Sequence, residues 1–187
     1  MMKSKLANKA LLESIRHLIT AARTKVQRTV NSIMVQTYWE IGRLIIEEEQ
    51  QGKSRAAYGK QQLEELATQL TEEFGRGFNA RNLRNMRAFY EAYPIWNAVS
   101  TKLSWTHYRH LIRVNNQQAR EWYANEAIEQ SWSARALDRQ INVLYYERLL
   151  ASKENPLVKA EAVEKTKPLA ESPKDYLRDP YLLDFLN

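Results

Sequence analysis

The chain of 187 residues carries 28 Lys and Arg against 22 Asp and Glu, contains no cysteine, and is 44% hydrophobic. This composition supports one well-packed domain with a tail and excludes a disordered or collagen-like chain. The lack of cysteine excludes disulfides, zinc ribbons and thiol nucleophiles. The polar start and the absence of a long apolar run predict no signal peptide and no membrane span, and therefore a cytoplasmic location.

The first fifty residues carry a long apolar pattern with the period of a helix. Over residues 5–49 there is no proline, and similar side chains recur every three or four positions. These are Leu11, Ile15, Leu18, Ala22, Val26, Val30, Ile33, Thr37, Ile41 and Ile45. The spacing predicts one long α-helix, or two with a soft break. Because one small domain rarely covers so long a stripe, we expect a homodimer formed through this helix.

Shorter helices are expected as far as residue 150. Counting their capping residues, they cover residues 60–74, 80–93, 104–114, 115–129 and 133–150. Gly75 is placed to end the first of them and Asn79 to cap the second. The sequence shows no convincing alternating β pattern and no repeat. The expected fold class is therefore all-α, a multi-helix domain with a long N-terminal helix and a helix-turn-helix-like unit.

The composition changes after residue 150. Four of the five prolines fall here, and Lys and Glu alternate without an apolar period. This pattern predicts an extended, partly disordered linker that ends in a short apolar piece at residues 181–186 with nothing after it to pack against. We therefore expect a helical domain over residues 1–150 and a linker rich in proline and charge over residues 151–187.

Positive charge is concentrated in one segment of the helical domain. Residues 76–120 hold eight Lys and Arg and one acid, a net charge of +7 against +6 for the whole chain. Such clustering favours a phosphate-bearing partner. In the same region, helices at residues 60–74 and 80–93 are joined by a short turn that contains glycine, which is the arrangement of a helix-turn-helix.

Helical geometry divides the second of these helices into two faces. The core face holds Leu83, Met86, Phe89, Tyr90 and Tyr93, and the opposite face holds Arg81, Arg84, Asn85, Arg87 and Ala88. Arginine can bind guanine, and asparagine adenine, through paired hydrogen bonds. We therefore expect duplex DNA as the partner. The candidate contact residues are Arg76, Asn79, Arg81, Arg84, Asn85, Arg87, Arg109 and Arg113. An ordinary solvated helix face is the alternative interpretation.

No catalytic or metal site is expected. His107 and His110 could share a helix face, but no cysteine and no acid close in sequence accompanies them. The chain has no nucleophile elbow and no phosphate-binding glycine loop. Aromatic side chains are dense between residues 89 and 146, where stacking on unpaired bases is the alternative to the core role that we expect. We expect no cofactor.

Six short stretches carry a family resemblance over most of the chain. They are residues 38–42 (YWEIG), 74–78 (FGRGF), 81–87 (RNLRNMR), 103–108 (LSWTHY), 119–123 (AREWY) and 179–181 (DPY). Together they resemble the N-terminal domain of the YhcG-like family, whose members are described as PD-(D/E)XK nucleases. In that family a helical domain precedes the nuclease domain, and the DPY stretch looks like the start of the latter.

The resemblance implies an accessory role: binding DNA, dimerising or positioning a nuclease. The acidic and lysine residues with which such a nuclease binds metal have no counterpart in residues 1–187, so we expect the chain to lack a catalytic site. The leading hypothesis is a DNA-binding accessory domain of a nuclease that uses the basic helix-turn-helix. The alternative is a helical protein-interaction or dimerisation module that positions a separate nuclease domain.

Overall fold

The computed structural model describes residues 2–51, 56–152, 155–169 and 180–186, and within them every regular element is a helix. The elements are α1 (Met2–Gln51), α2 (Ala56–Phe74), η1 (Arg76–Phe78), α3 (Ala80–Ala92), η2 (Trp96–Ala98), α4 (Trp105–Leu111), α5 (Gln117–Glu129), α6 (Ala134–Asn142), α7 (Tyr145–Ala151), α8 (Asn155–Thr166), η3 (Lys167–Leu169) and α10 (Pro180–Leu186). The expected all-α class with a long N-terminal helix is confirmed. In the described ranges no helix has the length and apolarity that a bilayer crossing needs.

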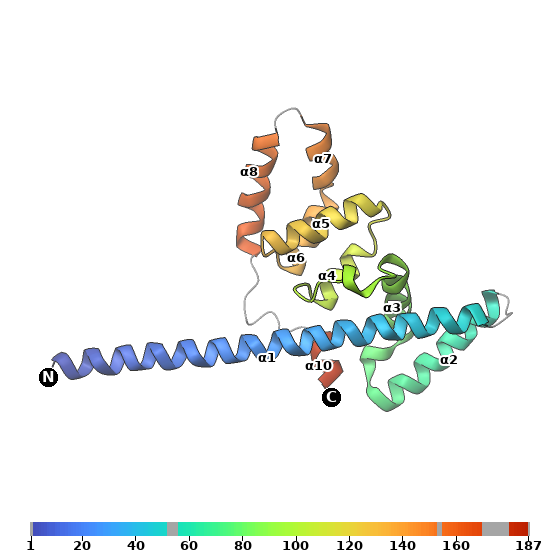
Figure 1. Cartoon of the computed structure of the whole chain (residues 1–187), viewed down its shortest axis with the longest axis horizontal. Coiled ribbons are helices and arrows are strands. Elements are labelled where there is room, and N and C mark those ends of the chain that lie inside the picture. The colour runs from blue at the N-terminus through green and yellow to red at the C-terminus, as the bar shows by residue number, and fades with distance from the viewer. Residues whose placement is uncertain (1, 52–55, 153–154, 170–179, 187) are drawn as a thin grey trace.

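The helices are arranged around one end of α1, as Figure 1 shows. The C-terminal half of α1 runs through the body of the molecule, whereas its N-terminal half projects from it. The chain then turns back into α2, which diverges from α1, while α4 to α8 rise on one side. The short α10 returns to the middle of α1, where it also meets η1.

The contact between α1 and α3 is the most extensive between any two helices of the described chain, and it depends on Gly42. A Cβ atom at this position would lie 2.1 Å from the carbonyl oxygen of Met86, so only glycine lets the two backbones approach so closely. Nearby, the indole nitrogen of Trp39 donates a hydrogen bond of 2.7 Å to the carbonyl of Tyr93 at the end of α3. These contacts fix α3 along the C-terminal half of α1.

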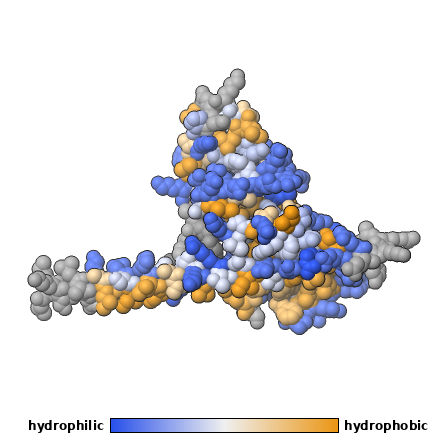
Figure 2. Space-filling view, in the orientation of Figure 1, coloured by the Kyte–Doolittle hydropathy of each residue, from blue (hydrophilic) through white to orange (hydrophobic). Residues whose placement is uncertain are grey.

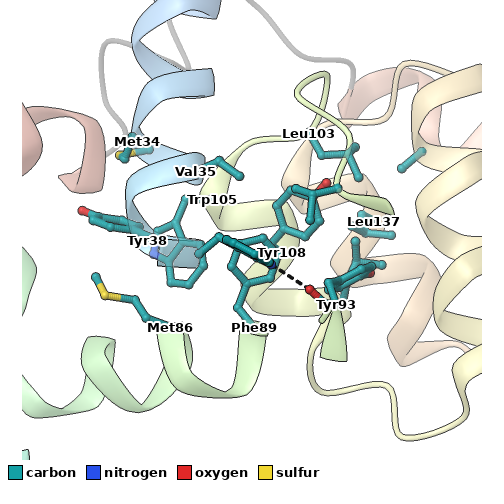
Figure 3. Packing of buried hydrophobic residues seen from close by; sticks show 14 of the residues in the cluster. Met34, Val35, Tyr38, Met86, Phe89, Tyr93, Leu103, Trp105, Tyr108 and Leu137 are labelled. Carbon is teal, nitrogen blue, oxygen red and sulfur yellow. Dashed lines mark hydrogen bonds between the residues drawn. The ribbon is translucent and has the colours of Figure 1, made fainter. Parts of the chain in front are cut away.

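Aromatic side chains form the centre of the core (Figure 3). The ring of Tyr38 on α1 meets Trp105 on α4 edge to face at 5.0 Å between centroids, and Phe89 on α3 lies 4.6 Å from Tyr108. All four of these side chains are almost completely buried. The core role that the sequence predicted for the dense aromatic residues between 89 and 146 is therefore confirmed for Phe89, Trp105 and Tyr108.

Two helices replace the single helix expected at residues 133–150. Helix α6 ends at Asn142, and α7 begins after Leu144, whose φ of 52° lies in the left-handed region. Beyond the break, the backbone N–H of Tyr146 donates to the hydroxyl of Tyr123 at 3.0 Å. The prediction was wrong because a helical period continues across residues 143–144, and only the contact with α5 shows that the chain turns there.

The expected extended linker is also wrong for the part of it that the structure describes. Residues Asn155–Thr166 form α8, where Ala162 and Thr166 are buried and the side-chain amide of Gln140 donates to the carbonyl of Ala162 at 3.4 Å. The apolar piece near the end forms α10, in which Leu182 is buried and Phe185 meets Tyr38 at 5.9 Å. The packing partners of this piece, α1 and η1, both precede it in the chain. Residues 170–179 of the expected linker lie outside the described residues.

Candidate nucleic-acid interface

The turn between α2 and α3 depends on two residues that are recognisable in the sequence, a glycine that ends α2 and an asparagine that caps α3. Gly75 has φ of 89° and ψ of −177°, a conformation that is available almost only to glycine. Asn79 caps α3, because its side-chain oxygen accepts from the N–H of Asn82 at 3.0 Å and its amide donates to the carbonyl of Arg76 at 2.7 Å. The predicted end of α2 and the predicted cap of α3 are both confirmed.

The two faces of α3 lie as predicted. Leu83, Met86 and Phe89 have no exposed surface, whereas Arg81 and Arg84 are exposed on the other side. Tyr90 is half-buried and meets Trp39 at 5.0 Å between ring centroids. The start of α3 therefore presents cations outward, above a core that holds the helix in place.

Asn82 is a structural residue that the sequence analysis did not single out. Its amide donates to the carbonyl of Gly77 at 2.6 Å, and its side-chain oxygen accepts from the indole of Trp105 at 3.1 Å. The side chain is buried and ties η1, α3 and α4 together. The signal that could have found it is its place next to Leu83 on the core side of the helix, where a polar group needs buried partners.

Two of the expected contact residues on α3 form ion pairs with other residues of the chain. Arg84 forms an ion pair with Glu64 of α2, and both side chains are about half exposed. Arg87 pairs with Glu49 of α1 at 2.8 Å and with Glu91 at 3.3 Å. The carboxylates of neighbouring helices thus neutralise part of the expected basic face.

The two arginines at the turn, Arg76 and Arg81, form fewer contacts with other side chains than Arg84 and Arg87 do. Arg76 and Arg81 are exposed, and the guanidinium of neither forms an ion pair or hydrogen bond with another described residue; the carbonyl of Arg76 accepts from Asn79. Asn85 is half-buried on the same side of α3. The structure therefore brings Arg76 and Arg81 to one accessible end of the helix, while the cap takes up both polar atoms of Asn79.

The expected residues on α4 lie in different surroundings. The guanidinium of Arg109 stacks over the ring of Tyr181 on α10, 4.6 Å from its centre. This arginine therefore contacts the C-terminal helix. Arg113 is exposed just after α4. Both arginines are close enough to help lower the pKa of His110, although burial is the larger cause.

A further cation of the basic segment stabilises the fold. The guanidinium of Arg120 donates to the carbonyls of Val114 at 3.0 Å and Ala92 at 3.4 Å, and it lies 5.6 Å from the centre of the Tyr93 ring. Arg120 therefore stabilises the C-terminal end of α3, because carbonyl groups there have no hydrogen-bond partner within the helix. Only part of the local charge of +7 is thus left for an external ligand.

The two histidines of α4 have structural partners. His107 is buried and takes part in the capping box of α4 through Nδ1, while Nε2 donates to the carbonyl of Trp132 at 2.9 Å. Burial lowers the pKa of His107 to about 4, so the ring is neutral near pH 7. Nδ1 of His110 lies 2.7 Å from a carboxylate oxygen of Asp138. In the described part of the chain, no three His, Asp or Glu side chains gather as metal ligands would.

Comparison with known proteins defines the class of this helical domain. The DUF1016 N-terminal domain family matches residues 14–148, which include α2, α3 and α4. The chain therefore belongs to this family.

The chain is also similar to a named protein. The chain is 37% identical over 207 residues to "Putative nuclease YhcG" of Escherichia coli (strain K12). The match takes in 93% of this chain and 54% of that protein, so the chain spans about half the length of its relative. No solved structure matches it.

Proposed function

We propose that the chain is an accessory domain that binds duplex DNA through η1 and the start of α3. The observation that carries the proposal is the exposed pair Arg76 and Arg81, which lie beside a helix N-terminus without an ion-pair partner among the described residues. Helix N-termini attract phosphate because the helix dipole and free N–H groups point outward there. A relative with a nuclease name makes DNA the most reasonable polyanion.

The ion pairs on α3 narrow the set of contact residues. Arg84 and Glu64 are both about half exposed, and such pairs contribute only about 0–1 kcal/mol, so Arg84 can exchange its carboxylate for a phosphate at little cost. Arg87 holds two carboxylates and is instead a residue that positions α3 against α1. Because Asn79 caps α3 and Arg109 stacks on Tyr181, we propose Arg76, Arg81, Arg84 and Asn85 as the contact set, with the exposed Arg113 as an outlying part.

This set favours phosphate contacts over base contacts. Arg76 lies in the turn before the helix, where DNA-binding helix-turn-helix units meet the backbone of the duplex. We therefore propose binding that depends strongly on salt and weakly on sequence. In this proposal the domain contributes no catalytic group and positions a nuclease activity that resides elsewhere.

The second candidate function is dimerisation through α1. It is favoured by the apolar side chains of the projecting half of this helix, of which Leu11, Leu18 and Val26 are 59%, 68% and 62% exposed. Monomeric proteins rarely expose a continuous apolar stripe of this length. The two candidate functions are compatible, because a dimer would present two copies of the α3 surface.

The first prediction concerns DNA binding itself. The protein should bind a fluorescent duplex, with the affinity falling by orders of magnitude between about 50 and 200 mM salt as counterions are released. Changing Arg76 and Arg81 together to Ala should weaken binding on the order of tenfold and reduce the slope of log K against log salt by about two. Fluorescence anisotropy across a salt series measures both quantities.

The matched control removes the same charge from α6. Arg135→Ala with Arg139→Ala also deletes two exposed arginines, but on a helix outside the proposed surface. This pair should lower the affinity much less than the Arg76 and Arg81 pair. Equal binding by the Arg76/Arg81 variant and the parent protein, or no binding even at low salt, would contradict the proposed function.

A further inference from the structure

The N-terminal half of α1, which we call the arm (residues 9–26), has a continuous apolar side without a partner in the described chain. Leu11, Ile15, Leu18 and Val26 lie on this side, and each is between 44% and 68% exposed. Figure 2 shows hydrophobic surface along one edge of the projecting helix. Leaving so many large side chains in water is unfavourable, so the arm needs a partner surface.

A matching apolar groove lies at the other end of the same helix. Because α2 diverges from α1, the two helices leave a groove of about 580 Å³ between them. Its walls are mostly aliphatic and aromatic, and they include Ile41, Leu44, Leu66, Leu70 and Phe74. Leu44 is 56% exposed and Phe74 49% exposed, so the groove is open on its outer side.

The apolar positions on α1 are arranged symmetrically along the helix. Ile15, Leu18, Ala22 and Val26 are followed by Ile33, Thr37, Ile41 and Leu44, and the successive spacings of 3, 4, 4, 7, 4, 4 and 3 read the same in both directions. At 100° per residue, these positions form one stripe centred between residues 29 and 30. Two antiparallel copies of α1 would therefore pair 15 with 44, 18 with 41, 22 with 37 and 26 with 33.

The charges on the two surfaces are complementary. Residues 9–28 hold five Lys and Arg (Lys9, Arg16, Arg23, Lys25 and Arg28) and one acid, Glu13. On α2, residues 61–74 hold four acids (Glu64, Glu65, Glu72 and Glu73) and no Lys or Arg, and the single cation of this helix, Lys60, precedes them. In the antiparallel arrangement, the side of the arm that carries Arg16 and Arg23 faces the acidic α2 of the other copy. Opposite charges then flank the apolar contact.

We propose that two copies of this chain form a symmetric antiparallel dimer in which the arm of each copy lies in the α1–α2 groove of the other. The arm cannot reach the groove of its own chain, because both belong to the same continuous helix. A two-fold axis near residues 29 and 30 gives two identical contacts and closes the assembly. This inference rests on the second candidate function and specifies its partner and geometry.

The size of the contact is adequate for a stable dimer. The stripe and the groove together offer about ten large apolar side chains in each copy, many of them about half exposed. Covering them in both copies would bury on the order of 1,500 Å², which is the size of a standard specific interface. An apolar centre flanked by charges is also the usual composition of such interfaces.

Engineered cysteines test the register, because the chain has no cysteine of its own. Val26→Cys in one copy and Ile33→Cys in a size-tagged second copy should form a disulfide when the two are mixed. Either variant alone should cross-link at least tenfold more slowly, since residues 26 and 26 of the two copies would lie about 10 Å apart along the axis, beyond disulfide reach. Ala21→Cys, exposed on another side of α1, is the control for random collision.

Each outcome of the cross-linking test decides something. Rapid cross-linking of Val26→Cys with itself would indicate a parallel pair and overturn the proposal. A dimer mass by light scattering without the 26–33 cross-link would overturn the register while leaving dimerisation intact. A strict monomer at high micromolar concentration would refute both this inference and the second candidate function. DNA binding is measured separately and can survive any of these results.

Charge-introducing variants test whether the arm contacts α2 as well as α1. Leu18→Glu in the arm and Leu66→Glu in the groove should each weaken the dimer at least tenfold, whereas Leu157→Glu, exposed on α8, should not. Mixing the arm variant with the groove variant should partly restore dimers, because one arm and one groove are then both intact. If Leu66→Glu leaves dimerisation unchanged, the α1–α2 groove is not the docking site.

Discussion

At the scale of single residues, His107 illustrates how burial decides the chemistry of a side chain. The residue is 2% exposed; its ring takes part in the cap of α4 through Nδ1 and donates to the carbonyl of Trp132 through Nε2. Because this environment disfavours a second proton, the pKa falls to about 4 from the ordinary value of 6.5. The histidine that could have been suspected as a ligand is a neutral hydrogen-bonding link between α4 and the turn before α6.

The pKa of His107 gives a prediction about pH. Between pH 6.5 and 4 the unfolded chain binds a proton at this ring that the folded chain does not, so the free energy of unfolding falls as the pH falls. The loss from this group should be on the order of 3 kcal/mol by pH 4, and urea unfolding across this range measures it. His110, whose pKa burial also lowers, adds to the effect in the same direction.

The control for this pH effect is His107→Gln. Glutamine keeps a donor and an acceptor but does not titrate, so the decline between pH 6.5 and 5, above the main range of carboxylate titration, should become shallower. A decline identical to that of the parent protein would show that other groups are responsible.

At the scale of the elements, the pairing of α1 with α3 determines where the candidate DNA surface lies. Close approach at Gly42 and the hydrogen bond from Trp39 hold α3 along α1, and the ion pair of Arg87 with Glu49 adds a contact further along. The core face of α3 is consequently fixed inward and the start of the helix outward. The orientation of Arg81 thus depends on a glycine about forty positions earlier in the chain.

Gly42→Ala should therefore destabilise the protein strongly. The new methyl group would meet the carbonyl of Met86 at 2.1 Å, and backbone cannot move aside as a flexible side chain does. We expect a loss of about 3 kcal/mol in the free energy of unfolding, with a corresponding fall in the melting temperature. Gly77→Ala is the comparison, because its Cβ would lie 3.1 Å from the side chain of Asp184 and needs a smaller shift. Equal losses for both would contradict the close-packing argument.

At the scale of the whole molecule, the last described helix, α10, returns to pack against the first helix, α1. Helix α10 packs against α1 and η1, with Phe185 meeting Tyr38 and Tyr181 lying under Arg109. Figure 1 shows that this helix lies beside α1, far from α8. Pro180 and Tyr181, two residues of the DPY stretch that resembles the start of a following domain, therefore belong to a helix that packs against the body of this one.

This arrangement predicts that α10 contributes to stability. Leu182→Ala should lower the free energy of unfolding by about 2–3 kcal/mol, since the side chain is buried. Leu157→Ala, at a leucine that is 65% exposed on α8, should change it by less than about 0.5 kcal/mol. Chemical denaturation of the two variants measures the difference. If Leu182→Ala behaves like Leu157→Ala, α10 does not stay docked in solution.

The sequence by itself determined the features that depend on neighbours along the chain. The end of α2 at Gly75, the cap of α3 at Asn79 and the buried side of α3 all follow from spacings of a few residues. Helical period and capping act within one or two turns, so a linear pattern contains them. The exposed stripe of the arm is visible in the same way.

The tertiary structure alone decided which cations remain accessible and where the chain bends. Arg84 pairs with Glu64, 20 positions away, and Arg87 pairs with Glu49, 38 positions away. No pattern along the sequence predicts either pair. The bend at Leu144, the docking of α10 and the groove between α1 and α2 likewise depend on contacts between distant segments. Periodicity shows which side of a helix is apolar, but the partner that covers this side, or leaves it open, is determined only when the chain has folded.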